Sequence, residues 1–169
     1  PITQFVPGYE LVRKLGQGGL GAVFLARQHS SGRMVALKVI LPESAVSEDG
    51  TKRFLREASV MSRLDHPRIV QFYEMGLAQG QFFFAMEYVN TIDFERVLST
   101  KRDAVRIKTM CGIMCQVLEG LVHAHAHSFV HRDIKPGNIL VAREGRRLSA
   151  KLADFGLAKN FENAGFSGM

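Results

Sequence analysis

The side chains best suited to chemistry lie in two short segments, His131–Asn138 and Asp154–Gly156. In the first, Asp133 and Asn138 stand five residues apart across a loop that contains a proline. The second follows two short strand-like stretches and opens with a carboxylate. Two carboxylates and a carboxamide form an all-oxygen set suited to Mg²⁺, which keeps some waters and shares its remaining positions with phosphates. Lys135 adds a positive charge that a transferring phosphoryl group could use.

A glycine-rich stretch, Gly16–Gly21, has the pattern G-x-G-x-x-G and is followed by Val23. Glycines let a turn bring backbone N–H groups against phosphate oxygens, because no Cβ stands in the way. Dinucleotide-binding folds use the same pattern, but there it opens a helix. Here the residues after Gly21 are typical of a strand. The sequence therefore favours a glycine-rich hairpin that lies across a bound nucleotide. The alternative is a flexible hairpin without a ligand.

Two charged residues interrupt apolar patterns. Lys38 lies inside the strand-like run Met34–Leu41, where alternation places it on the face of Ala36 and away from the larger aliphatic residues. Glu57 falls on the apolar stripe of a helix predicted over residues 47–64. Burying either charge alone is costly. We therefore expect the two to face one cavity and pair, with the ammonium also meeting an anion. The alternative is that each reaches solvent from the end of its element.

The wider pattern predicts an α+β fold of two lobes, because strands dominate the first part of the chain and helices the second. A first domain at residues 1–89 would carry the glycine-rich loop, Lys38 and Glu57, and a second at residues 90–169 would carry the polar segments. A turn is expected at Gly76 and Gly80, between the strands predicted at residues 69–73 and 81–89. The predicted strands are residues 9–15, 22–27, 34–41, 69–73, 81–89, 139–142 and 151–153, and the predicted helices are 47–64 and 105–125.

Composition narrows the class of protein. The 169 residues carry a net charge of +6, but the basic residues are scattered and form no run with interleaved aromatics, so no nucleic-acid partner is expected. Cys111 and Cys115 are predicted to be small apolar core residues in a reducing cytosol, rather than a metal or redox pair. No apolar run approaches the roughly 20 residues of a membrane span. The chain begins at Pro1, so we expect its natural start to be missing, and a membrane anchor in the parent protein stays open.

Together and in this order, the polar segments resemble the signature motifs of the protein-kinase family. G-x-G-x-x-G-x-V corresponds to Gly16–Val23, V-A-I-K to Val35–Lys38, H-R-D-L-x-x-x-N to His131–Asn138 and D-F-G to Asp154–Gly156. The resemblance runs from about Tyr9 to the end and is most similar to bacterial, eukaryotic-like Ser/Thr kinases. It implies a two-lobed kinase fold with a truncated helical second lobe, a cytoplasmic location, ATP and Mg²⁺ as cofactors, and protein substrates that carry Ser or Thr.

Carried over position by position, the resemblance implies catalytic roles. Asp133 would accept the proton of the substrate hydroxyl, and Lys135 would steady the γ-phosphate. The pair Lys135-Pro136 is similar to the pattern of Ser/Thr kinases. Lys38 would bind the α- and β-phosphates and pair with Glu57. The implied metal ligands are Asn138 and Asp154.

The resemblance also implies a nucleotide site. Val23, Ala36 and Leu140 would sandwich the adenine ring, Met86 would be the gatekeeper, and the backbone of Glu87–Val89 would hydrogen-bond adenine. A stacked apolar column is implied for Met61, Phe72, His131 and Phe155. The complete set of implied ATP-binding residues is Leu15, Gly16, Gln17, Gly18, Gly19, Gly21, Val23, Ala36, Lys38, Met86, Glu87, Val89 and Leu140.

The chain also departs from the family pattern. No A-P-E motif follows Gly156, and the chain stops inside the activation segment. In this family later helices cover the apolar face of the helix predicted at 105–125, so we expect a fragment that is aggregation-prone and nearly inactive alone. Arg132 implies activation by phosphorylation. Ser167 is the one hydroxyl after Gly156, with a phosphosite further downstream as the alternative. Ser128 stands where relatives often have glycine.

Two other interpretations account for part of the sequence. A pseudokinase that binds nucleotide without transferring phosphate is disfavoured, because all the residues of the expected active site are present. A metal site in the histidine-rich stretch is also disfavoured, since alternate spacing does not place side chains on one helix face. The histidines concerned are His123, His125, His127 and His131.

Overall fold

The computed structural model describes residues 6–18, 21–40 and 64–155, and the structural statements below concern these ranges. Two compact units occur within them: residues 6–18, 21–40 and 71–88 form the first, and residues 64–70 and 89–155 the second. The predicted division between residues 89 and 90 stays a prediction. The predicted helix at 47–64 lies, apart from its last residue, outside the described residues, and so do Gly19, Glu57, Met61, Gly156 and Ser167.

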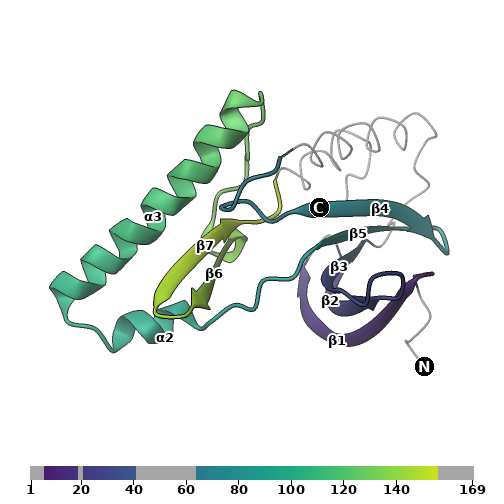
Figure 1. The fold of residues 1–169 in the computed structure, drawn as a ribbon, viewed down its shortest axis with the longest axis horizontal. Coiled ribbons are helices and arrows are strands. Elements are labelled where there is room, and N and C mark those ends of the chain that lie inside the picture. Colours follow the sequence, from purple (N-terminus) through teal and green to yellow (C-terminus); the bar gives the residue numbers. More distant parts are fainter. Residues whose placement is uncertain (1–5, 19–20, 41–63, 156–169) are drawn as a thin grey trace. The chain divides into compact units, whose positions relative to one another are not determined.

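An antiparallel sheet of five strands makes up the first unit (Figure 1). The neighbouring strands β1 and β2, and β4 and β5, are hairpins of consecutive strands, as short connections favour. The order is β1-β2-β3-β5-β4. The strands are β1 (Tyr9–Gly18), β2 (Gly21–Gln28), β3 (Met34–Ile40), β4 (Phe72–Ala78) and β5 (Gln81–Glu87).

One face of this sheet carries the core of the first unit. Val35, Leu37 and Val39 alternate along β3, are at most 5% exposed, and pack against buried residues of β2 and β5. Successive residues of a strand point to opposite faces, so Ala36 and Lys38 belong to the other face. The face assignment predicted from the sequence is therefore confirmed.

The strand β4 differs from the sequence prediction. We expected a strand at 69–73 with Gly76 in the following turn, but β4 continues to Ala78 and the turn lies at Gln79–Gly80. Phe83 provides the physical reason. Gly76 lies opposite Phe83 in the register of β4 and β5, and a Cβ added to it would lie 2.6 Å from two atoms of that ring. The glycine makes room for an aromatic side chain within the strand, so reading it as a turn residue was wrong.

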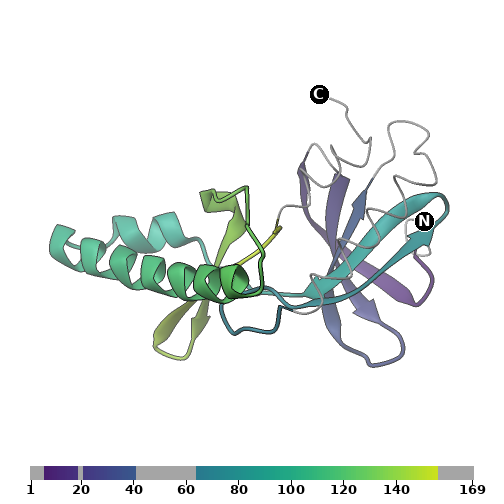
Figure 2. The same cartoon turned by 90° about the horizontal axis from the view of Figure 1, so that it is seen from above.

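The second unit combines two helices with a two-stranded antiparallel sheet. Both views show the hairpin of β6 and β7 along one side of α3, with α2 near the first turns of α3 (Figures 1 and 2). Helix α2 was not expected; it is capped by the carboxylate of Asp93, which accepts the Arg96 N–H at 2.9 Å. The elements are α2 (Phe94–Ser99), α3 (Asp103–Ala126), the 3₁₀ turn η2 (Pro136–Asn138), β6 (Ile139–Glu144) and β7 (Arg147–Leu152).

Helix α3 buries a narrower stripe than its sequence suggests. The buried positions recur at spacings of three and four and are Ile113, Val117, Gly120 and Ala124. The broad apolar face read from the sequence stays exposed, with Ile107, Met110, Met114, Leu118 and Val122 each at least 43% accessible. Cys111 and Cys115 are also exposed. The prediction that these cysteines are core residues is wrong, because they lie outside the stripe that packs on the rest of the unit.

The end of α3 explains one departure from the family pattern. Ser128 has a φ of +63°, in the left-handed region that glycine adopts without strain. The Phe129 N–H donates to the carbonyl of Ala124 at 2.8 Å, which closes the helix in the way that left-handed caps do. A glycine at this position in relatives therefore has a conformational reason.

None of the described helices, α3 included, is both long and apolar enough to cross a membrane.

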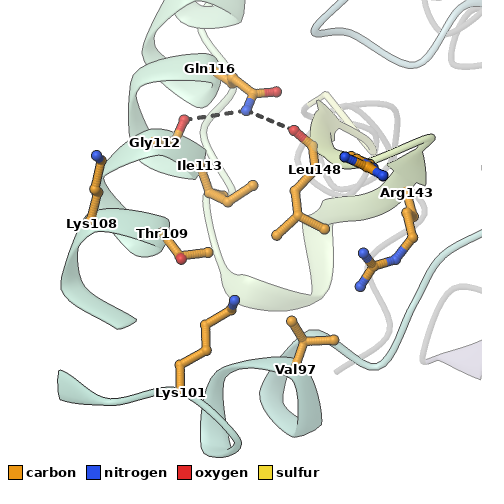
Figure 3. Close-up of a pocket in the computed structure, with 10 residues that line it drawn as sticks. Val97, Lys101, Lys108, Thr109, Gly112, Ile113, Gln116, Arg143 and Leu148 are labelled. Atoms are coloured by element: carbon orange, nitrogen blue, oxygen red, sulfur yellow. Dashed lines mark hydrogen bonds between the residues drawn. The ribbon is translucent and has the colours of Figure 1, made fainter. Parts of the chain in front are cut away.

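Gln116 fastens α3 to the hairpin (Figure 3). Its side-chain Nε2 donates to the carbonyl of Leu148 at 3.2 Å, and its Oε1 accepts the N–H of Ala150 at 2.9 Å. The amide therefore pairs with the backbone of β7 as a neighbouring strand would. Ala150 is fully buried, so its N–H has no access to water in exchange.

We predict that Gln116→Ala lowers the free energy of unfolding by about 1–3 kcal/mol, because it leaves a buried donor of β7 without an acceptor. Urea denaturation followed by circular dichroism measures the change. Cys111→Ala, on the exposed side of the same helix, is the control and should stay within about 0.5 kcal/mol of the wild type. Equal stability of the two variants would contradict the role assigned to Gln116.

Candidate active site

His131 anchors the polar loop from inside the second unit. Its side chain is 1% exposed, and its ring lies 4.4 Å from the ring of Phe155, centroid to centroid. Nε2 lies 3.0 Å from the carbonyl oxygen of Ala153, which can only accept, and Nδ1 receives the N–H of Asp133 at 3.3 Å. These partners require the neutral ring with its proton on Nε2. Burial lowers the pKa of His131, which favours the same neutral form.

Asp133 is held by two side chains of the same loop. Lys135 Nζ lies 2.9 Å from Asp133 Oδ2, and Asn138 Nδ2 donates to that oxygen at 3.0 Å and to the backbone carbonyl of Asp133 at 2.7 Å. The hydrogen bond from Lys135, with that from Asn138, lowers the pKa of Asp133 against the opposing effect of partial burial. The carboxylate is therefore ionised at neutral pH and fixed in orientation.

The hairpin of β6 and β7 brings Asp154 to the same loop. Asn138 ends η2 just before β6, and Ala153 directly follows β7, whose last residue pairs with the first of β6. The Ala153 N–H donates to the Asn138 carbonyl at 2.9 Å. Antiparallel pairing thus places residues distant in sequence at the same end of the hairpin. Of the predicted site residues, Asp133, Lys135, Asn138 and Asp154 are brought together in this way.

Two residues of this region have unusual backbone conformations. Arg132 has a φ of +62° and Asp154 a φ of +57°, both in the left-handed region. Such conformations cost about 1–3 kcal/mol and persist only where the surrounding contacts impose them. The buried His131 beside Arg132, and Ala153 beside Asp154, are the two residues joined by the Nε2 contact. The contact therefore joins the residues that directly precede the two strained positions.

In the first unit, the predicted nucleotide residues share one face of the sheet. Val23 lies opposite Lys38 in the register of β2 and β3, and Ala36 lies opposite Met86 in that of β3 and β5. Directly paired residues point to the same face, so all four lie opposite the core face. Lys38 is 8% exposed, which confirms that this charge is buried within its strand. Its predicted partner Glu57 lies outside the described residues.

The glycine-rich segment forms the expected hairpin rather than the start of a helix. Strands β1 and β2 pair up to Gly18 and Gly21. Gly21 has a φ of +138°, and a Cβ there would collide with the carbonyl oxygen of Val39 in β3. This glycine is thus required by packing within the sheet. Next to Gly16, where a Cβ would meet no atom within 4 Å, the side chains of Leu15 and Gln17 are exposed.

The remaining predicted nucleotide residues are partly buried. The backbone N–H of Glu87 donates to the carbonyl of Gln71 at 2.8 Å, so the Glu87 N–H serves the fold rather than adenine. Val89 and Leu140 belong to the second unit. Phe72, expected in an apolar column, is buried against the ring of Phe84 at a centroid distance of 6.1 Å.

Two supporting residues had no signal in the sequence. The guanidinium of Arg68 bonds Ser149 Oγ at 3.0 Å and Glu119 Oε2 at 3.2 Å, and its backbone carbonyl accepts the N–H of Leu152 at 2.8 Å. Arg68 therefore ties the segment before β4 to α3 and β7. Gln116 is the second such residue. A single arginine or glutamine follows no spacing rule, so only the structure reveals these contacts.

Two rings of the histidine-rich stretch, those of His123 and His127, pack together with the ring of His66. His123 lies between His66 at 4.8 Å and His127 at 4.4 Å, centroid to centroid. Burial, followed by the charge of His123, lowers the pKa of His66. Within the described ranges, no group of three or more His, Cys, Asp or Glu residues is arranged to hold a metal ion.

Known proteins share this sequence and this arrangement. Residues 9–167 match the family described as protein kinase domain. The Ser/Thr protein kinase PknJ of Mycobacterium tuberculosis is 37% identical over 166 residues, which cover 95% of this chain and 27% of PknJ. PrkC of Bacillus subtilis is 37% identical over 150 residues, which cover 89% of this chain and 22% of PrkC.

A solved structure supports the fold. The kinase domain of Mycobacterium tuberculosis PknI, as a double mutant, superposes with a TM-score of 0.77 at 31% identity, over 93% of this chain and 64% of that domain. The chain belongs to the protein-kinase family and has its α+β fold, with a β-rich first lobe and a truncated helical second lobe. The family uses ATP with Mg²⁺. The chain spans about a quarter of the length of these two curated relatives.

We predict that Lys135→Met raises the pKa of Asp133 part of the way back to its ordinary value of about 3.9, because the bond from Asn138 remains. A carboxyl ¹³C NMR titration of the aspartates measures this shift. Lys108→Met, which removes an exposed lysine of α3, is the control and should leave Asp133 unchanged. An Asp133 pKa that does not move in Lys135→Met would show that Lys135 is not its main stabilising partner.

Proposed function

We propose that this chain is the catalytic part of a protein serine/threonine kinase, which transfers the γ-phosphoryl group of ATP to Ser or Thr hydroxyls of proteins with Mg²⁺ as cofactor. The observation that carries this proposal is the carboxylate of Asp133, which Lys135 and Asn138 hold in place. The hydrogen bond from the Ala153 N–H to the Asn138 carbonyl brings the neighbouring Asp154 to the same loop. The named Ser/Thr kinases support the substrate class. We propose a cytoplasmic location for this reaction.

We assign Asp133 the role of orienting the substrate hydroxyl and accepting its proton. Both side-chain bonds of Asp133 fall on Oδ2, and among the described residues none bonds to Oδ1. Oδ1 is thus available to a hydroxyl. The lowered pKa makes this carboxylate a weak base. A weak base is sufficient where the transition state is loose, because positioning and electrostatic stabilisation then dominate phosphoryl transfer.

Lys135 has a second partner in this proposal. Its ammonium has three donors, so it can contact the γ-phosphate without releasing Asp133. Lys135 is more than half exposed, which leaves its remaining donors accessible. Contact with a phosphate would share the charge of Lys135 between two anions. Lys135 would then lower the pKa of Asp133 less. The base would then become stronger when substrate is bound.

Asn138 and Asp154 fit a Mg²⁺ ion. Asn138 Nδ2 is committed to Asp133, so the carboxamide presents Oδ1 as a ligand. With the Asp154 carboxylate, it would supply the hard oxygen atoms that Mg²⁺ prefers. When bound, the ion would supply positive charge that stabilises the phosphate groups. Both residues lie at the same end of the β6–β7 hairpin, since Asn138 directly precedes β6 and Asp154 lies two residues after β7.

We assign ATP binding to the remaining predicted residues. Lys38 would contact the α- and β-phosphates and pair with Glu57. Val23, Ala36 and Met86 share the face of Lys38 and are proposed to contact adenine, as is Leu140. The glycine-rich hairpin would place backbone N–H groups against the phosphates.

We predict that Asp133→Asn lowers phosphate incorporation from radiolabelled ATP by roughly 10²-fold or more, because the proton acceptor is lost. The assay uses the full-length protein and a mixed Ser/Thr peptide library, and the Kd for ATP should change little. Asp103→Asn, in the first turn of α3, is the control with the same change of charge. Equal incorporation by wild type and Asp133→Asn would refute the assignment, and ATP binding by a wild type that transfers no phosphate would identify a pseudokinase.

A further inference from the structure

A basic pocket of about 310 Å³ lies in the second unit, among α2 and the segment after it, helix α3 and the β6–β7 hairpin (Figure 3). It is separate from Asp133 and the residues that hold it, none of which lines it. Its lining residues are Val97, Lys101, Lys108, Thr109, Gly112, Ile113, Gln116, Arg143, Arg146 and Leu148.

The pocket carries four cations and no carboxylate. Lys101, Lys108, Arg143 and Arg146 line it, and no acidic residue does. None of the four forms an ion pair or a side-chain hydrogen bond with a described residue. The neighbouring cation Arg106, by contrast, is paired with Asp103 at 2.7 Å. The pocket therefore concentrates positive charge that the described part of the chain leaves uncompensated.

The uncharged side-chain donors of the pocket are already hydrogen-bonded to backbone carbonyls, so the four cations are the donors available to a ligand. Gln116 Nε2 is engaged by the carbonyls of Gly112 and Leu148, and the Thr109 hydroxyl donates to the carbonyl of Val105 at 2.7 Å. The floor is apolar, with the side chains of Ile113 and Leu148 at its centre (Figure 3).

Two of the cations point into the pocket. Figure 3 shows the ammonium of Lys101 and the guanidinium of Arg143 reaching the space at the tip of the Leu148 side chain from different elements, whereas Lys108 runs along the outer side of α3. Lys101 is half-buried, which restricts its movement, and Arg143 is exposed at the rim. A planar guanidinium and a point-like ammonium together suit a tetrahedral anion with several oxygen atoms.

We propose that this pocket binds the phosphate group of a phosphorylated Ser or Thr side chain in a peptide segment. Its volume exceeds that of a phosphate ion, so an adjoining apolar side chain can contact Leu148 and Val97 while Lys101 and Arg143 meet the phosphate. A dianion gains more than a carboxylate from two cations. The lining contains no aromatic residue on which a base could stack, which disfavours a single-stranded nucleic acid. The inference does not rest on the catalytic role of Asp133.

The test is fluorescence anisotropy with the full-length protein and a labelled pentapeptide that carries phosphothreonine next to leucine. We expect saturable binding of this peptide, and none of the unphosphorylated peptide. Lys101→Gln and Arg143→Gln should each raise its Kd by about tenfold or more, the usual cost of removing a charge-assisted hydrogen bond. Arg102→Gln removes an exposed charge beside the pocket and should raise the Kd less than about threefold.

Three results would overturn the proposal. One is the absence of saturable binding of the phosphopeptide. Another is an equal loss of affinity in Arg102→Gln and Arg143→Gln, which would indicate general attraction to a basic surface. The third is tighter binding of a single-stranded oligonucleotide than of the phosphopeptide. Because Asp133→Asn should leave peptide binding intact, failure of the proposed kinase activity and failure of this site can be told apart.

Discussion

The candidate site depends on the two hydrogen bonds that the neutral imidazole of His131 makes. One ring nitrogen reaches the carbonyl of Ala153 and the other receives the N–H of Asp133, so a single buried side chain joins two segments that are 22 residues apart. A charged ring could not serve both partners, because its second N–H would face the N–H of Asp133. Burial selects the required form by making the charged state costly.

The other polar contacts follow from this anchor. With the loop fixed at Asp133 and the hairpin fixed at Ala153, the side chain of Asn138 can bridge back to Asp133 while its carbonyl accepts the Ala153 N–H. Arg132 and Asp154, which have left-handed conformations, directly follow the two residues that the His131 contact joins. Arg68 and Gln116 then secure the hairpin from the side of α3. Local strain and buried polar groups are thus concentrated where the proposed chemistry requires a fixed geometry.

The sequence predicted the features that local rules govern. The glycine-rich hairpin followed from the strand-like residues after Gly21, and the burial of Lys38 followed from alternation in β3. The features that depend on tertiary contacts were missed. Gly76 was predicted in a turn, but it lies within β4, where the Phe83 ring leaves no room for a Cβ. The cysteines of α3 were predicted in the core, but a different stripe of the helix packs against the hairpin. The roles of Lys38, Asp133, Asn138 and Asp154 came from the family resemblance and stay predictions.

The protonation state of His131 tests this account most directly. ¹⁵N NMR of the histidine rings in the full-length protein reports which nitrogen carries the proton. We expect Nε2 to be protonated and Nδ1 to be bare at pH 7, and the ring to stay neutral as the pH is lowered through 6.5, the ordinary pKa of histidine. A proton on Nδ1 at pH 7, or a ring that becomes charged at or above pH 6.5, would contradict the anchor and the arrangement built on it.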